Sequence, residues 1–138
     1  MRKTVLAAAA ILASVLVLLA TVFLIRAGIL RSREQSAYRF ALQDGLYALE
    51  QGRTDDAEEH LLRAAESAHS PDAWLRLLKN ARRLPEEALY RELLRRGYAA
   101  FPGSEPLAAA RGFGLLEEGE AAEAWKILSR EVNPEAYP

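Results

Sequence analysis

The chain has 138 residues, of which 51% are hydrophobic and 27% charged, and this length is enough for one modest domain. It contains no cysteine, which excludes disulfides, thiolate catalysis, zinc–thiolate sites and lipoprotein attachment. The formal net charge is -1 and no base-reading motif is present, so we expect no nucleic acid among its partners.

The first predicted element is an apolar helix over residues 4–25, TVLAAAAILASVLVLLATVFLI, which carries no charge across 22 positions. At about 1.5 Å per residue it spans the roughly 30 Å core of a bilayer. A cleaved signal peptide is one alternative, but its apolar region is usually shorter and ends at small residues. A buried core helix is another, although so short a chain has little to bury it. We predict an uncleaved membrane anchor over residues 1–30, with the lipid bilayer around residues 4–25.

Positive charges flank the apolar run almost equally. Arg2, Lys3 and the amino terminus precede it, whereas Arg26, Arg31 and Arg33 follow it. Because the short basic tail would have to cross against the membrane potential, we expect the N-terminus to lie in the cytoplasm. The protein is then a single-pass cell-membrane protein with an extracytoplasmic, periplasmic soluble domain, and a cytoplasmic domain is the alternative.

The rest of the chain predicts helices only. A stalk over residues 31–37 continues from the anchor into the first helix of the soluble part, and Gly52 supplies the turn that ends this helix. We predict that Thr54 caps the next helix and that Pro85 takes the first position of a later one. The further helices are expected at residues 55–68, 72–83, 85–101, 107–119 and 121–132. Because no alternating strand pattern is present, the predicted fold class is all-α.

The soluble part matches itself at a constant offset of 67 residues. The stretch GLYALEQGRTDDAEEHLLRA aligns with GFGLLEEGEAAEAWKILSRE, and residues 71–102 supply a copy between them. The offset corresponds to two periods of about 34 residues, which indicates three copies of one repeat. The aligned pairs include Gly45 with Gly112, Gly52 with Gly119, Ala57 with Ala124, and Leu61 with Leu128.

A helix–turn–helix unit of this period resembles the tetratricopeptide repeat, with its pattern W-x2-L-G-x2-Y, then A-x3-F, then P. The resemblance covers residues 38–136 and implies a short α-solenoid over residues 38–138, with repeats at about 38–70, 71–104 and 105–136. Ala57 and Ala124 fill the small-residue slot where paired helices approach most closely. Tyr90 stands there in the middle copy, so we expect a looser or shifted pairing at that point. Asp44 and Arg111 also depart from the pattern, in a slot that the family fills with leucine.

Charge is distributed by segment. Residues 37–72 carry three basic and eight acidic side chains, residues 73–98 seven and three, and residues 103–138 three and seven. One interpretation is ordinary solvated helix faces with pairs such as Glu87 and Arg91. The resemblance implies another, a concave groove with a basic centre and apolar flanks that suits an acidic, partly apolar peptide or helix. The predicted groove residues are Leu42, Leu46, Leu49, Lys79, Arg82, Arg83, Phe113 and Leu116.

Two functions follow from this organisation. The first is a membrane-tethered scaffold or adaptor that binds a partner protein through its groove and its exposed last helix. The second is a permanent structural subunit of a larger membrane or envelope complex, with the transmembrane helix and the last repeat as contact surfaces. No polar capping helix follows the last repeat, so its apolar surface needs the NPEAYP tail or, as we expect, a partner to cover it.

Catalytic and metal-binding patterns are weak. His60 and His69 lack the spacing of paired metal ligands, and no nucleophile, phosphate-loop or dinucleotide motif is present. We therefore predict no enzymatic activity, no cofactor and no metal.

Overall fold

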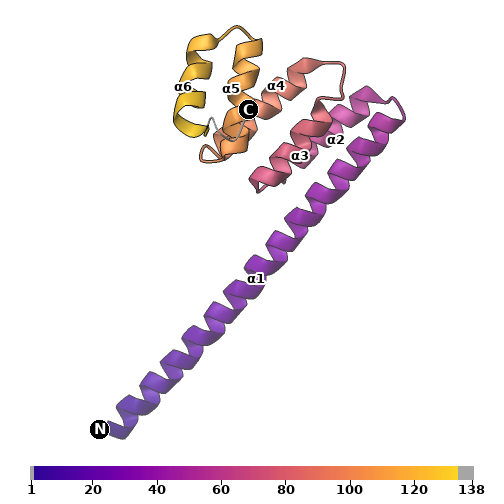
Figure 1. The fold of residues 1–138 in the computed structure, drawn as a ribbon. Helices are drawn as coiled ribbons and strands as arrows, with labels where there is room; N and C mark the ends of the chain where they lie inside the picture. The colour runs from indigo at the N-terminus through magenta and orange to yellow at the C-terminus, as the bar shows by residue number, and fades with distance from the viewer. Residues whose placement is uncertain (1, 134–138) are drawn as a thin grey trace. The chain divides into compact units, whose positions relative to one another are not determined.

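The computed structural model describes the backbone of residues 2–133 and the side chains of residues 11–133, and these residues form six helices and no strand (Figure 1). The predicted all-α class is therefore confirmed for the described part of the chain. In chain order the helices are α1 (Arg2–Glu50), α2 (Thr54–Glu66), α3 (Pro71–Ala81), α4 (Glu87–Ala100), α5 (Glu105–Glu117) and α6 (Ala121–Glu131).

The chain divides into two compact units, which we call the N-terminal unit (Met1–Ser36) and the helical unit (Ala37–Pro138). Helix α1 passes from the first into the second without a break, as the absence of proline predicts. The helical unit begins at Ala37, one residue before the predicted start of the first repeat at residue 38.

In the N-terminal unit, every described side chain from Ile11 onward is exposed. Helix α1 is long and apolar enough to cross a membrane. Its hydroxyl side chains bond within the helix: Thr21 Oγ1 donates to the carbonyl of Val17 at 2.8 Å, and Ser36 Oγ to that of Ser32 at 2.9 Å. Such bonds satisfy the hydroxyl donors without water, which suits an apolar surrounding.

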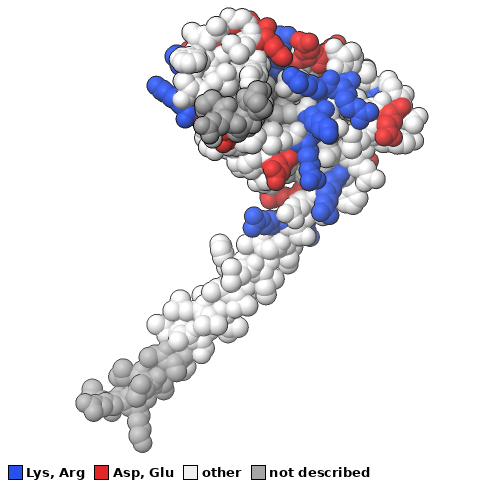
Figure 2. Space-filling model, in the orientation of Figure 1, with Lys and Arg blue, Asp and Glu red and all other residues white. Residues whose placement is uncertain are grey.

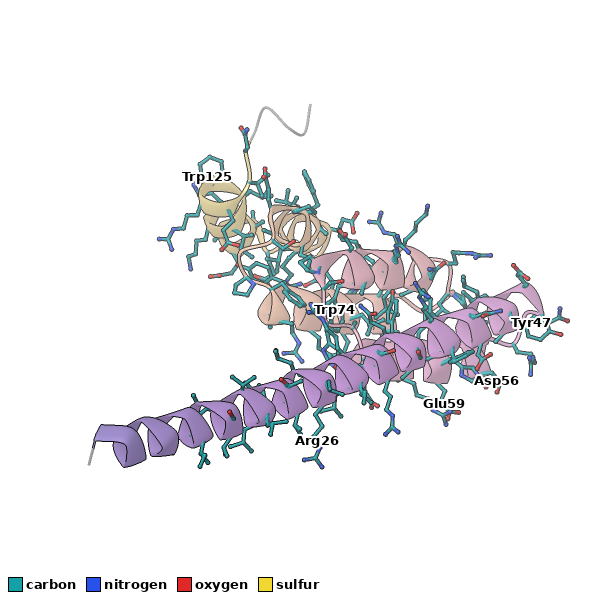
Figure 3. All side chains as sticks on the ribbon, turned by 90° about the horizontal axis from the view of Figure 1, so that it is seen from below. Arg26, Tyr47, Asp56, Glu59, Trp74 and Trp125 are labelled. Atoms are coloured by element: carbon teal, nitrogen blue, oxygen red, sulfur yellow. The ribbon has the colours of Figure 1, made fainter. Side chains whose placement is uncertain are left out.

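The helical unit is held by alanine and leucine side chains that recur at helical spacing on the inner faces of its helices. Helix α2, for example, buries Ala57, Leu61, Ala64 and Ala65. Trp74 of α3 is only 4% exposed and lies among the helices, as Figure 3 shows. The largest fully buried side chains are Leu61, Leu77, Leu93, Leu94 and Leu107.

Positions that are 67 residues apart occupy similar environments. A Cβ placed on Gly45 would lie 3.4 Å from Leu61 Cδ2, and one placed on Gly112 would lie 2.5 Å from Leu128 Cδ2. Each glycine thus lets its helix approach the equivalent leucine of the next helix. The turn glycines Gly52 and Gly119 both have positive φ values, 71° and 83°.

The small-residue slot also behaves similarly in the first and last copies. Ala57 and Ala124 are both 0% exposed, whereas Tyr90, at the equivalent position of the middle copy, is half-buried. Helices α3 and α4 approach each other over fewer residues than α5 and α6 do. That the middle pair is also looser than the first stays a prediction.

Four of the five predicted helix starts were wrong. Helix α3 begins at Pro71 rather than at residue 72, and α5 begins at Glu105 rather than at residue 107, because a proline occupies an early position in each. Helix α2 begins at Thr54 itself, because Arg53 takes the N-cap position and its side chain bonds to Asp56 at 3.0 Å. Helix α4 begins at Glu87 and not at Pro85, because Leu84, which is 9% exposed, packs into the core and the chain turns there. Glu86 then takes the N-cap position in an extended conformation.

One cap was not predicted. Ser70 precedes α3, and its Oγ accepts the backbone N–H of Ala73 at 3.2 Å. Pro71 then opens the helix, where a missing N–H costs no helical hydrogen bond.

Candidate partner-binding surface

The three predicted groove leucines of α1 are half-buried. Leu42 and Leu49 pack against the buried core of the helical unit, so they stabilise the fold and offer only part of their surface. Leu46 is also half-buried. The exposed apolar side chains of this segment are instead Phe40, at 68%, and Tyr47, at 57%.

A hydrogen bond ties this segment of α1 to α3. The hydroxyl of Tyr38 donates to the carbonyl of Ala73 at 2.8 Å. Burial raises the pKa of Tyr38, and the positive charge of Arg76 partly opposes that shift. The bond joins α1 to the first turn of α3.

The predicted basic centre lies at the C-terminal end of α3 and just beyond it. Lys79, Arg82 and Arg83 are all exposed. Within the described residues, Lys79 and Arg83 have no carboxylate at ion-pair distance, whereas Arg82 lies 3.7 Å from Glu117 of α5. Figure 2 shows Lys and Arg side chains gathered over the α3 region of the helical unit.

Several cations of other helices are neutralised within their own helix. The side chains concerned pair at i,i+3 or i,i+4, in Arg63–Glu59, Arg91–Glu87, Arg95–Glu92 and Lys126–Glu123. Helix α3 has only one acidic residue, Asp72, and it lies in the first turn. Its C-terminal cations consequently lack a partner one turn away and remain available to a ligand.

Sequence reasoning missed one member of this surface, Arg76. It is exposed and precedes Lys79 by three residues, which places these two side chains on one face of α3, whereas Arg83 lies beyond the end of the helix at Ala81. The signal was present in the i, i+3 spacing of Arg76 and Lys79.

The predicted apolar flank on α5 is exposed. Phe113 is 48% and Leu116 is 46% exposed. Leu116 immediately precedes Glu117, whose contact with Arg82 brings the end of α5 to the end of α3. The Arg82–Glu117 contact is thus the link between the basic residues and α5, on which Phe113 lies one turn before Glu117, while the α1 leucines are half-buried.

The last helix, α6, carries the most exposed aromatic side chain among the described residues of the helical unit. Trp125 is 72% exposed and projects from α6, whereas Trp74 lies inside (Figure 3). The positions equivalent to Trp125 in the earlier copies hold charged residues, such as Glu58 of α2. The NPEAYP tail that was considered as a cover for this helix lies, beyond Asn133, outside the described residues.

The described residues contain no cluster of three or more His, Asp or Glu side chains that could hold a metal ion. Comparisons with protein-family models, with curated proteins and with solved structures gave no match. The tetratricopeptide resemblance thus rests on the sequence pattern alone.

Proposed function

We propose that this chain is a membrane-tethered adaptor whose tetratricopeptide-like helical unit binds an acidic segment of a partner protein. Residues 4–25 are its transmembrane anchor, and the helical unit lies on the extracytoplasmic side of the cell membrane. The apolar, fully exposed side chains of α1 from Ile11 to Ile25 support the anchor, because such a surface is costly in water.

The observation that carries the binding proposal is the pair of exposed cations without an ion pair, Lys79 and Arg83, next to Arg82, whose contact with Glu117 links them to α5 and its exposed Phe113 and Leu116. Partner carboxylates would pair with the cations, and partner apolar side chains would cover the α5 flank. Arg82 can join them, because its contact with Glu117 is long, at 3.7 Å, and both side chains are more than 60% exposed.

The test is charge reversal with a charge-matched control. The partner is first identified by copurification in mild detergent and mass spectrometry. The variant Lys79→Glu, Arg82→Glu, Arg83→Glu should weaken its binding at least about tenfold. The control Arg63→Glu, Arg95→Glu, Lys126→Glu changes the net charge equally at exposed, internally paired sites, and it should retain binding. Equal losses in both variants would show that only bulk charge matters and would refute a localised site.

A second candidate function is favoured by Trp125. As a permanent subunit of a membrane complex, the chain would bury this side chain, 72% exposed in the free chain, against a neighbouring subunit. Under that proposal Trp125→Glu releases the partner and the triple charge reversal on α3 does not. The two candidates thus predict opposite results from the same pair of variants.

A further inference from the structure

A hollow of about 550 Å³ lies between the C-terminal end of α3, the start of α4 and the C-terminal end of α5. Apolar residues form part of its lining, namely Ala81, Leu84, Leu94 and Gly114, and the first three are core residues at most 9% exposed. Its volume lies within the range of roughly 300–1,000 Å³ that is usual for ligand pockets.

Tyr90 explains why the hollow occurs at the middle helix pair. It occupies the position where Ala57 and Ala124 let the other pairs approach closely, and it lines the hollow. A ring at this position keeps α3 and α4 apart near the α3–α4 turn. Gly114 brings α5 close to α4 on the other side, since a Cβ there would lie 3.0 Å from Leu94 Cδ2.

The rim offers a stacking surface. The guanidinium of Arg82 lies over the ring of Tyr90, 5.1 Å from its centroid. The Arg82 side chain is 61% exposed, so a second ring can contact the guanidinium face that Tyr90 leaves open.

The rim does not favour a cationic guest. Each carboxylate of the lining already has a cation close by, in the pairs Glu87–Arg91 (2.6 Å), Glu117–Arg82 (3.7 Å) and Glu118–Arg111 (3.6 Å). Among the described residues next to the lining in sequence, Lys79 and Arg83 are cations without an ion pair and Glu86 is a single carboxylate without one, so the excess charge there is positive and attracts carboxylates.

We infer that the hollow receives one aromatic side chain of the acidic partner segment, stacked on the guanidinium face of Arg82 that Tyr90 leaves open, with flanking carboxylates on Lys79 and Arg83. This inference rests on the proposed function and adds a sequence requirement to it: the bound segment has an aromatic residue among its acidic ones. An aromatic anchor in a pocket beside charged contacts is the arrangement that dominates affinity in many interfaces.

The inference is tested with the full chain in detergent micelles and two fluorescently labelled decapeptides. Both are rich in glutamate and serine, and they differ only in a central tryptophan or alanine. Wild-type protein should bind the tryptophan peptide about tenfold more tightly than the alanine peptide. In Tyr90→Ala this preference should fall below about threefold, because the ring that holds the Arg82 guanidinium in place is gone.

The matched control is Tyr47→Ala. The Tyr47 ring is also contacted by an arginine, Arg53, at 5.8 Å, but neither residue lines the hollow. This variant should keep the tenfold preference. If Tyr90→Ala fails to fold, as judged by helical circular dichroism, Arg82→Ala with Arg53→Ala as its control tests the same contact.

The outcomes separate the two proposals. Equal binding of both peptides by the wild type, abolished by charge reversal at Lys79, Arg82 and Arg83, would overturn the aromatic site and retain the acidic one. Failure of both peptides to bind would overturn the acidic site and the aromatic site together. A preference that persists in Tyr90→Ala and in Arg82→Ala would place the tryptophan elsewhere.

Discussion

Alanine substitution at Gly45 and Gly112 should change stability in opposite directions, although the two glycines are equivalent in the repeat. Both lie inside helices, where alanine is favoured over glycine by about 1 kcal/mol. The difference comes from the facing leucine. A Cβ at Gly45 would meet Leu61 at 3.4 Å, whereas one at Gly112 would meet both Cγ and Cδ2 of Leu128 at 2.5 Å.

These distances set the magnitudes. At Gly45 the new methyl group makes an ordinary contact, so Gly45→Ala should raise the free energy of unfolding by about 0.5–1 kcal/mol. At Gly112 the overlap with two atoms forces Leu128 to move, and overpacking of this kind costs about 1–3 kcal/mol. After the gain in helix propensity, Gly112→Ala should lower the free energy of unfolding by about 1–2 kcal/mol.

Urea unfolding of the full chain in detergent micelles, followed by tryptophan fluorescence, measures both effects. The signal reports on the helical unit alone, since Trp74 and Trp125 both lie in it. A double-mutant cycle isolates the contact: in a Leu128→Ala background, Gly112→Ala should become stabilising by about 1 kcal/mol. If Gly112→Ala stabilises the wild-type background as much as Gly45→Ala does, the close contact between α5 and α6 is incorrect.

Three further outcomes are expected. Ala124→Leu should lower the urea midpoint, at a cost of about 1–3 kcal/mol, far more than Ala122→Leu, because Ala124 is 0% exposed and Ala122 lies at the surface. Tyr38→Phe should cost about 1 kcal/mol at pH 7 through loss of its bond to α3, with exposed Tyr47→Phe as a neutral control. Because burial raises the pKa of Tyr38, its hydroxyl stabilises the fold fully below pH 10, and the gap between wild type and Tyr38→Phe should close as pH rises through the raised pKa. Deletion of residues 1–30 should leave a soluble protein with a helical circular dichroism spectrum, and a strand-rich spectrum would contradict the repeat.

The features that sequence reasoning located correctly are fixed by local chemistry or by repetition. Gly52 and Gly119 were expected at turns, and both have the positive φ that glycine adopts without strain. Ala57 and Ala124 were expected at close helix contacts, and both are completely buried. When two copies of a repeat match at a fixed offset, the same turn and packing constraints act on both. Each structural position can therefore be read from two residues of the sequence.

The features that sequence reasoning missed depend on residues that are distant in the chain or on small changes in the backbone. The start of α4 moved from Pro85 to Glu87 because Leu84 is drawn into the core, which no local pattern records. The stacking of Arg82 on Tyr90 and the hollow beside it require the positions of three helices at once. The sequence shows that Tyr90 replaces the small residue of the other copies, but it does not show the hollow that this ring lines.

Leaving the cations of the α3 region without ion pairs costs the fold little stability, so these cations can serve in binding. An exposed ion pair contributes only about 0–1 kcal/mol, so a helix that leaves Lys79 and Arg83 without partners loses little stability. Arg91 and Arg95 on α4, in contrast, are already neutralised by glutamates of their own helix and would have to break those pairs to bind a new carboxylate. A partner's carboxylate therefore meets no competing intrahelical glutamate on α3. The absence of glutamate from this one helix, rather than the number of cations on it, is why we propose it as the binding surface.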